Sequence, residues 1–151
     1  MTIPTPEVGL VISYSFLWSD EAEAGQVEGR KNRPCAIVLV VQQTEGAAPV
    51  VAVVPITHSP HQNLEGAIEI PTSVRRHLGL DDLPSWIVVG EFNVFTWPGF
   101  DLRPVPGQRD QYQYDYGFLP PALFRSVIQK FTELRRRGQA GGVERDEEPV
   151  R

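Results

Sequence analysis

The residues best suited to chemistry form a charged cluster just ahead of an apolar run. They are Glu28, Arg30, Lys31 and Arg33, followed directly by Pro34. A bound phosphate requires fixed cations, and the planar guanidinium of arginine can hold two phosphate oxygens at once. This spacing is therefore compatible with an anion site, although on composition alone a solvated charge cluster is the favoured interpretation.

A second polar segment, Thr57-His58-Ser59, follows the apolar run 50–56. The end of a strand is a rigid platform for hydroxyl and imidazole groups. If the runs 35–41 and 50–56 pair as an antiparallel hairpin, the start of one lies beside the end of the other, and Arg33 becomes a neighbour of Thr57. The simpler interpretation of this segment is a turn with hydrogen bonds from side chains to the backbone.

Together these side chains match the needs of RNA cleavage without a metal. The substrate's 2′-hydroxyl attacks the phosphate, so an enzyme must accept that proton, stabilise the pentacoordinate phosphate and protonate the leaving 5′-oxygen. Glu28 is the candidate base, Arg33 the candidate for holding the charge, and Thr57 the candidate for fixing the phosphate. Histidine changes its charge near neutral pH, which makes His58 the candidate acid. An idle, exposed histidine is an equally good interpretation of His58.

Further cations are candidates for contacts with RNA. Arg30 and Lys31 belong to the charged cluster, and Arg75 and Arg76 precede His77 in a second small basic patch. Such a patch on a helix is most often a solvated face, and contact with RNA is the functional alternative.

The remaining residues that often carry chemistry favour structural roles. Cys35 lies inside an apolar run, where a buried and inert thiol is more common than a nucleophile. His58 and His61 have no acidic or cysteine partner at ligand spacing, so a polar loop is favoured over a metal site. The chain has no phosphate-loop, dinucleotide-binding or nucleophile-elbow motif. We therefore expect neither a metal nor a cofactor.

Five short runs rich in β-branched and aromatic residues predict strands, at 9–17, 35–41, 50–56, 66–70 and 86–95. Their connections are too short for βαβ crossovers, which argues against an alternating α/β fold. The expected fold class is mainly β (α+β), a small bent sheet or barrel of about five strands closed by a C-terminal helix.

Two helices are expected. Between Pro120 and Gly138, apolar residues recur at steps of three and four, and three arginines occupy the final turn, where cations complement the helix dipole. A shorter helix is expected over 74–78, ended by Gly79.

The chain is expected to form a single domain over 1–137, followed by a disordered charged tail at 138–151. Within the domain, 18–33 is typical of a mobile loop and 96–119 of an irregular insertion. The insertion interleaves aromatic residues with arginines, for which packing or partner binding is favoured over stacking with RNA bases.

The composition of the chain limits the classes of protein to which it can belong. The 151 residues are 41% hydrophobic and 22% charged, with a net charge of −5, which argues against a broad non-specific nucleic-acid binder. No apolar run is long enough for a membrane span, and the N-terminal stretch is not typical of a signal peptide. A cytoplasmic protein is the simplest expectation.

The order of these segments resembles the MazF/PemK family, the toxins of bacterial type II toxin–antitoxin systems. The residues that carry the resemblance are the glycine-led strand at 9–17, the polar loop, the Arg33-Pro34 pair before an apolar strand, and Val53-Val54-Pro55-Ile56-Thr57. The similarity extends over most of 8–95 and 120–137. At 91–96 this chain has no arginine, where some family members have one.

The resemblance implies an SH3-like, CcdB/MazF-type barrel that forms a homodimer. It also implies a metal-independent endoribonuclease that cleaves single-stranded RNA and is inhibited by an antitoxin protein. Arg33 and Thr57 match the family residues that act at the scissile phosphate, and Glu28 lies five residues before Arg33, where some members carry an acidic residue proposed as a base. The alternative function is a catalytically inactive barrel that acts as a protein-binding or regulatory module.

Overall fold

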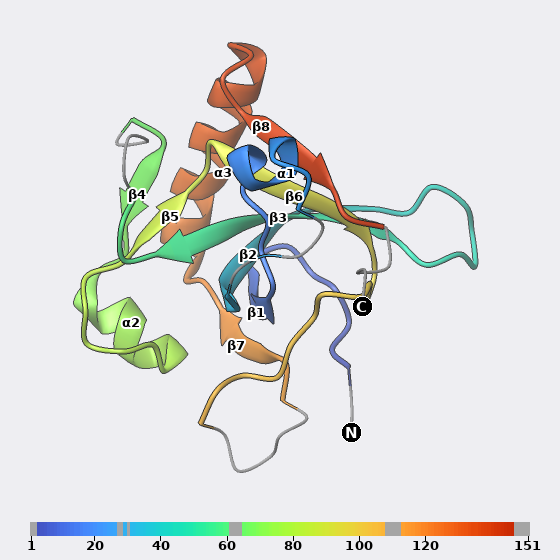
Figure 1. Ribbon diagram of the computed structural model, residues 1–151. Helices are drawn as coiled ribbons and strands as arrows, with labels where there is room; N and C mark the ends of the chain where they lie inside the picture. The colour runs from blue at the N-terminus through green and yellow to red at the C-terminus, as the bar shows by residue number, and fades with distance from the viewer. Residues whose placement is uncertain (1–2, 27–28, 30, 61–64, 108–112, 147–151) are drawn as a thin grey trace.

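The computed structural model describes residues 3–26, 29, 31–60, 65–107 and 113–146. In these residues eight strands form one sheet, with three helices around it (Figure 1). The strands are β1 (Leu10–Tyr14), β2 (Arg33–Val41), β3 (Val50–Thr57), β4 (Ala67–Glu69), β5 (Trp86–Val88), β6 (Glu91–Thr96), β7 (Asp115–Phe118) and β8 (Gly141–Glu144), and the helices are α1 (Ser19–Glu23), α2 (Thr72–Leu78) and α3 (Pro121–Arg136).

The sheet follows the order β4-β5-β3-β2-β1-β7. The long strand β3 pairs with β6 along its first half and with β5 at its end, so the sheet branches there. Every pair is antiparallel except β6 with β8, which is parallel. The expected class, a mainly β, barrel-like α+β fold with a C-terminal helix, is confirmed.

The five predicted strands are present, but the sheet contains more than five. The run 86–95 divides at Gly90 into β5 and β6, because Val89 and Gly90 form a turn. The strand β7 lies within 96–119 and pairs with β1, so the prediction of an irregular insertion is wrong for 115–118. The strand has only four residues, which include a glycine and the half-buried Asp115 and Tyr116. So short a segment has too little alternation of polar and apolar residues to be recognised as a strand from the sequence.

The prediction of a disordered tail at 138–151 is wrong for its first half. The strand β8 runs alongside β6, and the next residue, Arg145, is only 3% exposed. Its guanidinium contacts the carboxylate of Asp101 at 2.9 Å and donates to the Ser15 carbonyl at 2.8 Å. Small and charged residues are typical of disorder, yet here they meet partners far away in the sequence. Residues 147–151 lie outside the described residues.

The prediction of a mobile loop at 18–33 is also wrong for its beginning. Residues 19–23 form α1, and Glu21 accepts a hydrogen bond from the Trp18 backbone at 3.0 Å. The backbone N–H and the hydroxyl of Ser19 both donate to the Glu91 carboxylate, at 2.9 and 2.7 Å. The segment is therefore anchored to β6.

Two apolar clusters cover the two faces of the central strands. We call them the helix-side core, which includes Val127, Phe131 and Leu134 of α3, and the opposite core, which includes Phe95 and Trp97. Successive residues of β1, β2 and β3 alternate between the clusters because side chains of a strand alternate between faces. This double burial explains why these strands are continuous apolar runs rather than alternating ones.

The helix α3 confirms the element expected between Pro120 and Gly138. Its buried residues Val127, Phe131 and Leu134 lie at steps of three and four and face the helix-side core, and each contributes about 1.5–3 kcal/mol by burial. The helix passes behind the sheet, on the side away from α1 (Figure 1). None of the helices described is both long and apolar enough to cross a membrane.

Candidate functional site

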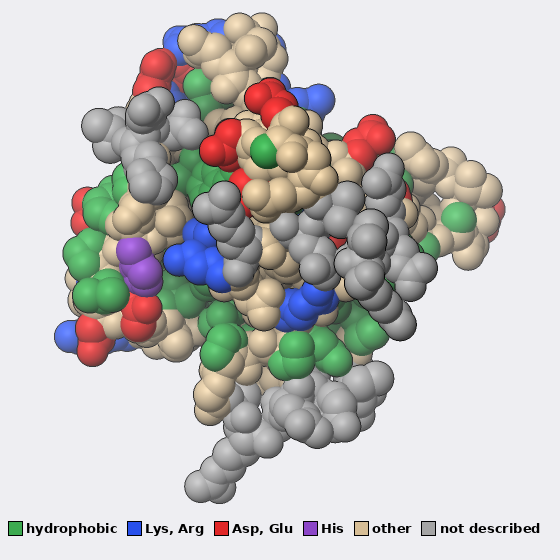
Figure 2. All heavy atoms as spheres, viewed as in Figure 1, with side chains coloured by type: hydrophobic (Ala, Val, Ile, Leu, Met, Phe, Trp, Pro, Cys, Tyr) green, Lys and Arg blue, Asp and Glu red, His purple; other side chains and the backbone are tan. Residues whose placement is uncertain are grey.

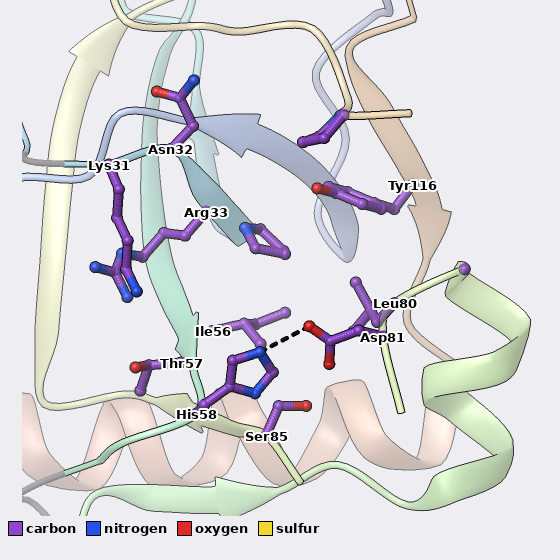
Figure 3. Close-up of a pocket in the computed structure, with 13 residues that line it drawn as sticks. Lys31, Asn32, Arg33, Ile56, Thr57, His58, Leu80, Asp81, Ser85 and Tyr116 are labelled. Carbon is purple, nitrogen blue, oxygen red and sulfur yellow. Dashed lines mark hydrogen bonds and ion pairs between the residues drawn. The ribbon is translucent and has the colours of Figure 1, made fainter. Parts of the chain in front are cut away.

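A pocket of about 350 Å³ opens where β2 begins and β3 ends (Figure 3). The register between these strands pairs Cys35 with Pro55, and continuing it by two residues brings Arg33 opposite Thr57. The predicted hairpin is confirmed, and both side chains line the pocket. The lining residues are Lys31, Asn32, Arg33, Pro34, Ile56, Thr57, His58, Gly79, Leu80, Asp81, Ser85, Pro106 and Tyr116.

Arg33 is the half-buried cation of this pocket. Its guanidinium carbon lies 5.2 Å from the centre of the Trp18 ring, which holds the planar group from one side. Burial lowers the pKa of Arg33, and the negative charge of Glu21 acts in the opposite direction. Arginine nevertheless stays protonated in proteins.

The Nε of Arg33 is buried and has no hydrogen-bond partner among the described residues. An unpartnered, buried N–H is costly, and an anion in the pocket would supply the missing acceptor.

His58 lies at the mouth of the pocket between two acceptors (Figure 3). Its Nδ1 is 2.9 Å from the Pro84 carbonyl oxygen, and its Nε2 is 2.9 Å from the Asp81 carboxylate. Both partners only accept, so both contacts are hydrogen bonds at once only when each ring nitrogen carries a proton. The side chain is 43% exposed, so a substrate can reach it.

Thr57 forms the turn that the sequence predicts. Its Oγ1 accepts a hydrogen bond from the Ser59 backbone N–H at 3.2 Å. The Thr57 hydroxyl itself points to the Ser59 carbonyl oxygen, which is 3.5 Å away. That second distance is long for a hydroxyl donor. The hydroxyl proton of this buried side chain is therefore available to a ligand oxygen in the pocket.

The predicted RNA-contacting residues do not all lie at this pocket. Lys31 is exposed and lines it, whereas Glu28 and Arg30 lie outside the described residues. Arg75 is buried, and its guanidinium donates to the Thr72 hydroxyl at 3.2 Å, so it does not belong to the exposed basic patch that we expected. Arg76 is exposed on α2 and does not line the pocket. Figure 2 shows a small group of Lys and Arg side chains beside a histidine, while other Lys and Arg side chains are scattered over the same face.

Several pocket residues were missed by the sequence reasoning. Asp81 and Ser85 line the pocket, and Trp18 and Glu21 support Arg33 from the start of α1. Tyr116 also lines the pocket, but it belongs to the aromatic residues of 96–119, for which stacking with RNA bases is one interpretation of the sequence. The pairing of β3 with β5 brings the α2–β5 connection beside the end of β3, which no local pattern indicates. Glu21 alone had a usable signal, because an acidic residue three positions into a helix often bonds to the helix's first backbone amide.

No protein-family model matches this chain, and neither a curated protein nor a solved structure shows significant similarity to it. Within the part of the chain that the structure describes, no group of three or more His, Cys, Asp and Glu residues is placed to hold a metal ion.

We expect Cys35 to be unreactive in the folded protein. Its side chain is fully buried, and burial raises the pKa of its thiol, so the nucleophilic thiolate does not form near neutral pH. A chromogenic disulfide reagent should label no thiol in the native protein and one equivalent in denaturant, because the chain has a single cysteine. Rapid native labelling would contradict this prediction.

Proposed function

We propose that this protein is an endoribonuclease that cleaves single-stranded RNA without a metal and serves as the toxin of a type II toxin–antitoxin system. The observation that supports the proposal most is that Arg33 at the start of β2, Thr57 at the end of β3 and His58 just after it line one pocket.

In the proposed mechanism Arg33 and Thr57 hold the scissile phosphate. The unpartnered Nε–H of Arg33 and the hydroxyl proton of Thr57 are donors without a close acceptor among the described residues. A phosphate offers acceptors to both, and its charge increases when the fifth oxygen bonds to phosphorus. Donors already in position stabilise that added charge without reorganisation.

His58 is the proposed general acid. The attacking 2′-oxygen bonds to phosphorus, and the bond from phosphorus to the 5′-oxygen breaks. One ring N–H of His58 exchanges its present acceptor for this 5′-oxygen and donates its proton to it, so the products are a 2′,3′-cyclic phosphate and a 5′-hydroxyl end. Asp81 orients the ring, since its carboxylate accepts from Nε2 and is itself held by the Leu83 backbone at 3.1 Å.

Glu28 remains the proposed base that accepts the 2′-hydroxyl proton. It stands five residues before Arg33 in the chain and lies outside the described residues. Arg30, Lys31 and Arg76 remain proposed contacts to neighbouring phosphates of the RNA.

The proposed partners are an antitoxin protein and a second copy of this chain, and the proposed location is the cytoplasm. Their support is the resemblance of the strand pattern to the MazF/PemK family, in which the SH3-like barrel acts as a homodimer.

The proposal is tested by incubating the purified protein with single-stranded RNA in the presence of EDTA. We expect cleavage, with 2′,3′-cyclic phosphate on the new 3′ ends. RNA that stays intact at high protein concentration would contradict the proposal. It would favour the alternative, a barrel that binds another protein.

Replacing His58 by glutamine is expected to lower the cleavage rate by about 10²-fold, since the leaving oxygen loses its proton donor. Asp81→Asn keeps an acceptor but removes its charge, and a smaller loss of about tenfold is expected. Single-turnover cleavage rates provide the measurement. His77→Gln is the matched control, because His77 is exposed on α2 and does not line the pocket. Equal rates for His58→Gln and this control would remove His58 from the mechanism.

A further inference from the structure

The pocket has two chemically different ends. Lys31, Asn32 and Arg33 supply positive charge and polar groups on one side, next to Thr57. The opposite side carries the apolar side chain of Leu80 and the aromatic ring of Tyr116, with Asp81 next to Leu80 (Figure 3). A small anion alone would use only the first end.

We infer that the second end is a subsite for the nucleobase attached to the bound phosphate, with Tyr116 and Ser85 as the residues that determine base recognition. This inference rests on the proposed function and deepens it, since it identifies the ligand of the pocket as one nucleotide. The phosphate lies against Arg33, and the base lies on the aromatic side.

The size of the pocket fits a single nucleotide. Its volume of about 350 Å³ lies near the lower end of the range for small-molecule sites, which is roughly 300–1,000 Å³. An apolar wall with a few polar groups is also the usual composition of such sites.

Tyr116 provides a surface on which a base can stack. The residue belongs to β7 and is half-buried, and Figure 3 shows its ring beside Leu80 at the edge of the pocket. Burial raises the pKa of Tyr116, so the ring remains a neutral phenol. Bases stack on aromatic rings whatever their identity.

Ser85 provides a hydrogen bond that no described residue uses. The side chain is 2% exposed and lines the pocket, and its Oγ has no hydrogen-bond partner among the described residues. A buried hydroxyl without a partner is unusual because it costs free energy. A polar edge of a base would satisfy it, since a hydroxyl can both donate and accept.

The inference is tested by calorimetric titration of the protein with each nucleoside 3′-monophosphate, with ribose 5-phosphate and with inorganic phosphate. At least one nucleotide should bind about tenfold or more tightly than ribose 5-phosphate, the gain expected from one stacked base. Equal affinity for the nucleotides and ribose 5-phosphate would overturn the inference.

Four variants show which residues cause the tighter binding of a nucleotide relative to ribose 5-phosphate. Tyr116→Leu and Ser85→Ala should each reduce the ratio of nucleotide to ribose 5-phosphate affinity. Tyr116→Phe keeps the ring and should retain the ratio, and Ser73→Ala is the matched serine control on the exposed face of α2. Ser85→Ala removes an unpartnered group, so this variant should fold normally. A ratio unchanged in both Tyr116→Leu and Ser85→Ala would overturn the inference.

The titration separates this inference from the proposed function. Base-dependent binding without RNA cleavage would uphold the subsite and reject the nuclease. If the protein cleaved RNA but bound nucleotides no better than ribose 5-phosphate, the nuclease would be upheld and the base subsite rejected.

Discussion

Replacing Arg33 by alanine is expected to lower the rate of RNA cleavage by about 10²–10³-fold, the loss typical of removing one preorganised donor to a developing charge. The effect should be large because Arg33 is the half-buried cation of the pocket and its Nε–H has no other described partner. The ring of Trp18 also orients its guanidinium before any substrate binds.

Single-turnover rates with a short single-stranded RNA measure this effect, and thermal unfolding shows whether the variant is folded. Arg33→Lys keeps the charge without the planar fork, so we expect a rate between those of the native protein and Arg33→Ala. Arg125→Ala is the control for loss of a single positive charge outside the pocket, because Arg125 is exposed on α3. If Arg33→Ala cleaved RNA as fast as Arg125→Ala, the phosphate could not lie at Arg33.

Replacing Arg145 by methionine is expected to lower the free energy of unfolding by about 3–5 kcal/mol, the usual cost of breaking a buried ion pair by removing one of its members. Arg145 and Asp101 are 3% and 1% exposed, and their charged groups are 2.9 Å apart. The same guanidinium donates to the side chain of Asn93 at 2.8 Å and lies 5.5 Å from the centre of the Tyr14 ring. The variant therefore disturbs several buried groups at once.

Urea unfolding measures the loss, with Arg125→Met as the control on the exposed surface of α3. The double variant Arg145→Met with Asp101→Leu should be more stable than Arg145→Met alone, because it also removes a buried carboxylate that has lost its 2.9 Å contact and keeps the longer one to Arg103 at 3.7 Å. A change of less than about 1 kcal/mol in Arg145→Met would show that the ion pair adds little to stability.

This ion pair also connects the C-terminal segment to the pocket. The Asp101 carbonyl accepts from the Ser15 backbone at 2.9 Å, and Leu102 forms a bridge with Tyr14 at the end of β1. Pro106 follows a few residues later and forms part of the pocket wall. The β8 strand and Arg145 therefore help to hold one wall of the pocket, although they lie far from it in the sequence.

Part of the site could be predicted because local patterns determine it. The continuous apolar runs of β2 and β3 and the short turn between them are enough to indicate an antiparallel hairpin. Once the hairpin is accepted, the geometry of an antiparallel pair brings Arg33 beside Thr57. In the same way, the three- and four-residue spacing of apolar residues predicts α3.

The other contacts depend on where distant segments meet. The pairing of β5 with β3 brings Asp81 to His58, and the pairing of β7 with β1 brings Tyr116 to the pocket. No local pattern in the tail predicts a strand, because the position of Arg145 is fixed by its ion pair with Asp101 and not by residues next to it in the sequence.

The sequence by itself thus determined the central hairpin, the terminal helix and the convergence of a guanidinium with a hydroxyl, because hydrophobic periodicity and strand geometry act over short distances along the chain. Only the tertiary structure decided which acceptors orient His58, what surrounds the second end of the pocket and whether the charged tail is ordered. These depend on burial and on charge pairing between segments far apart in sequence, and no local pattern encodes them.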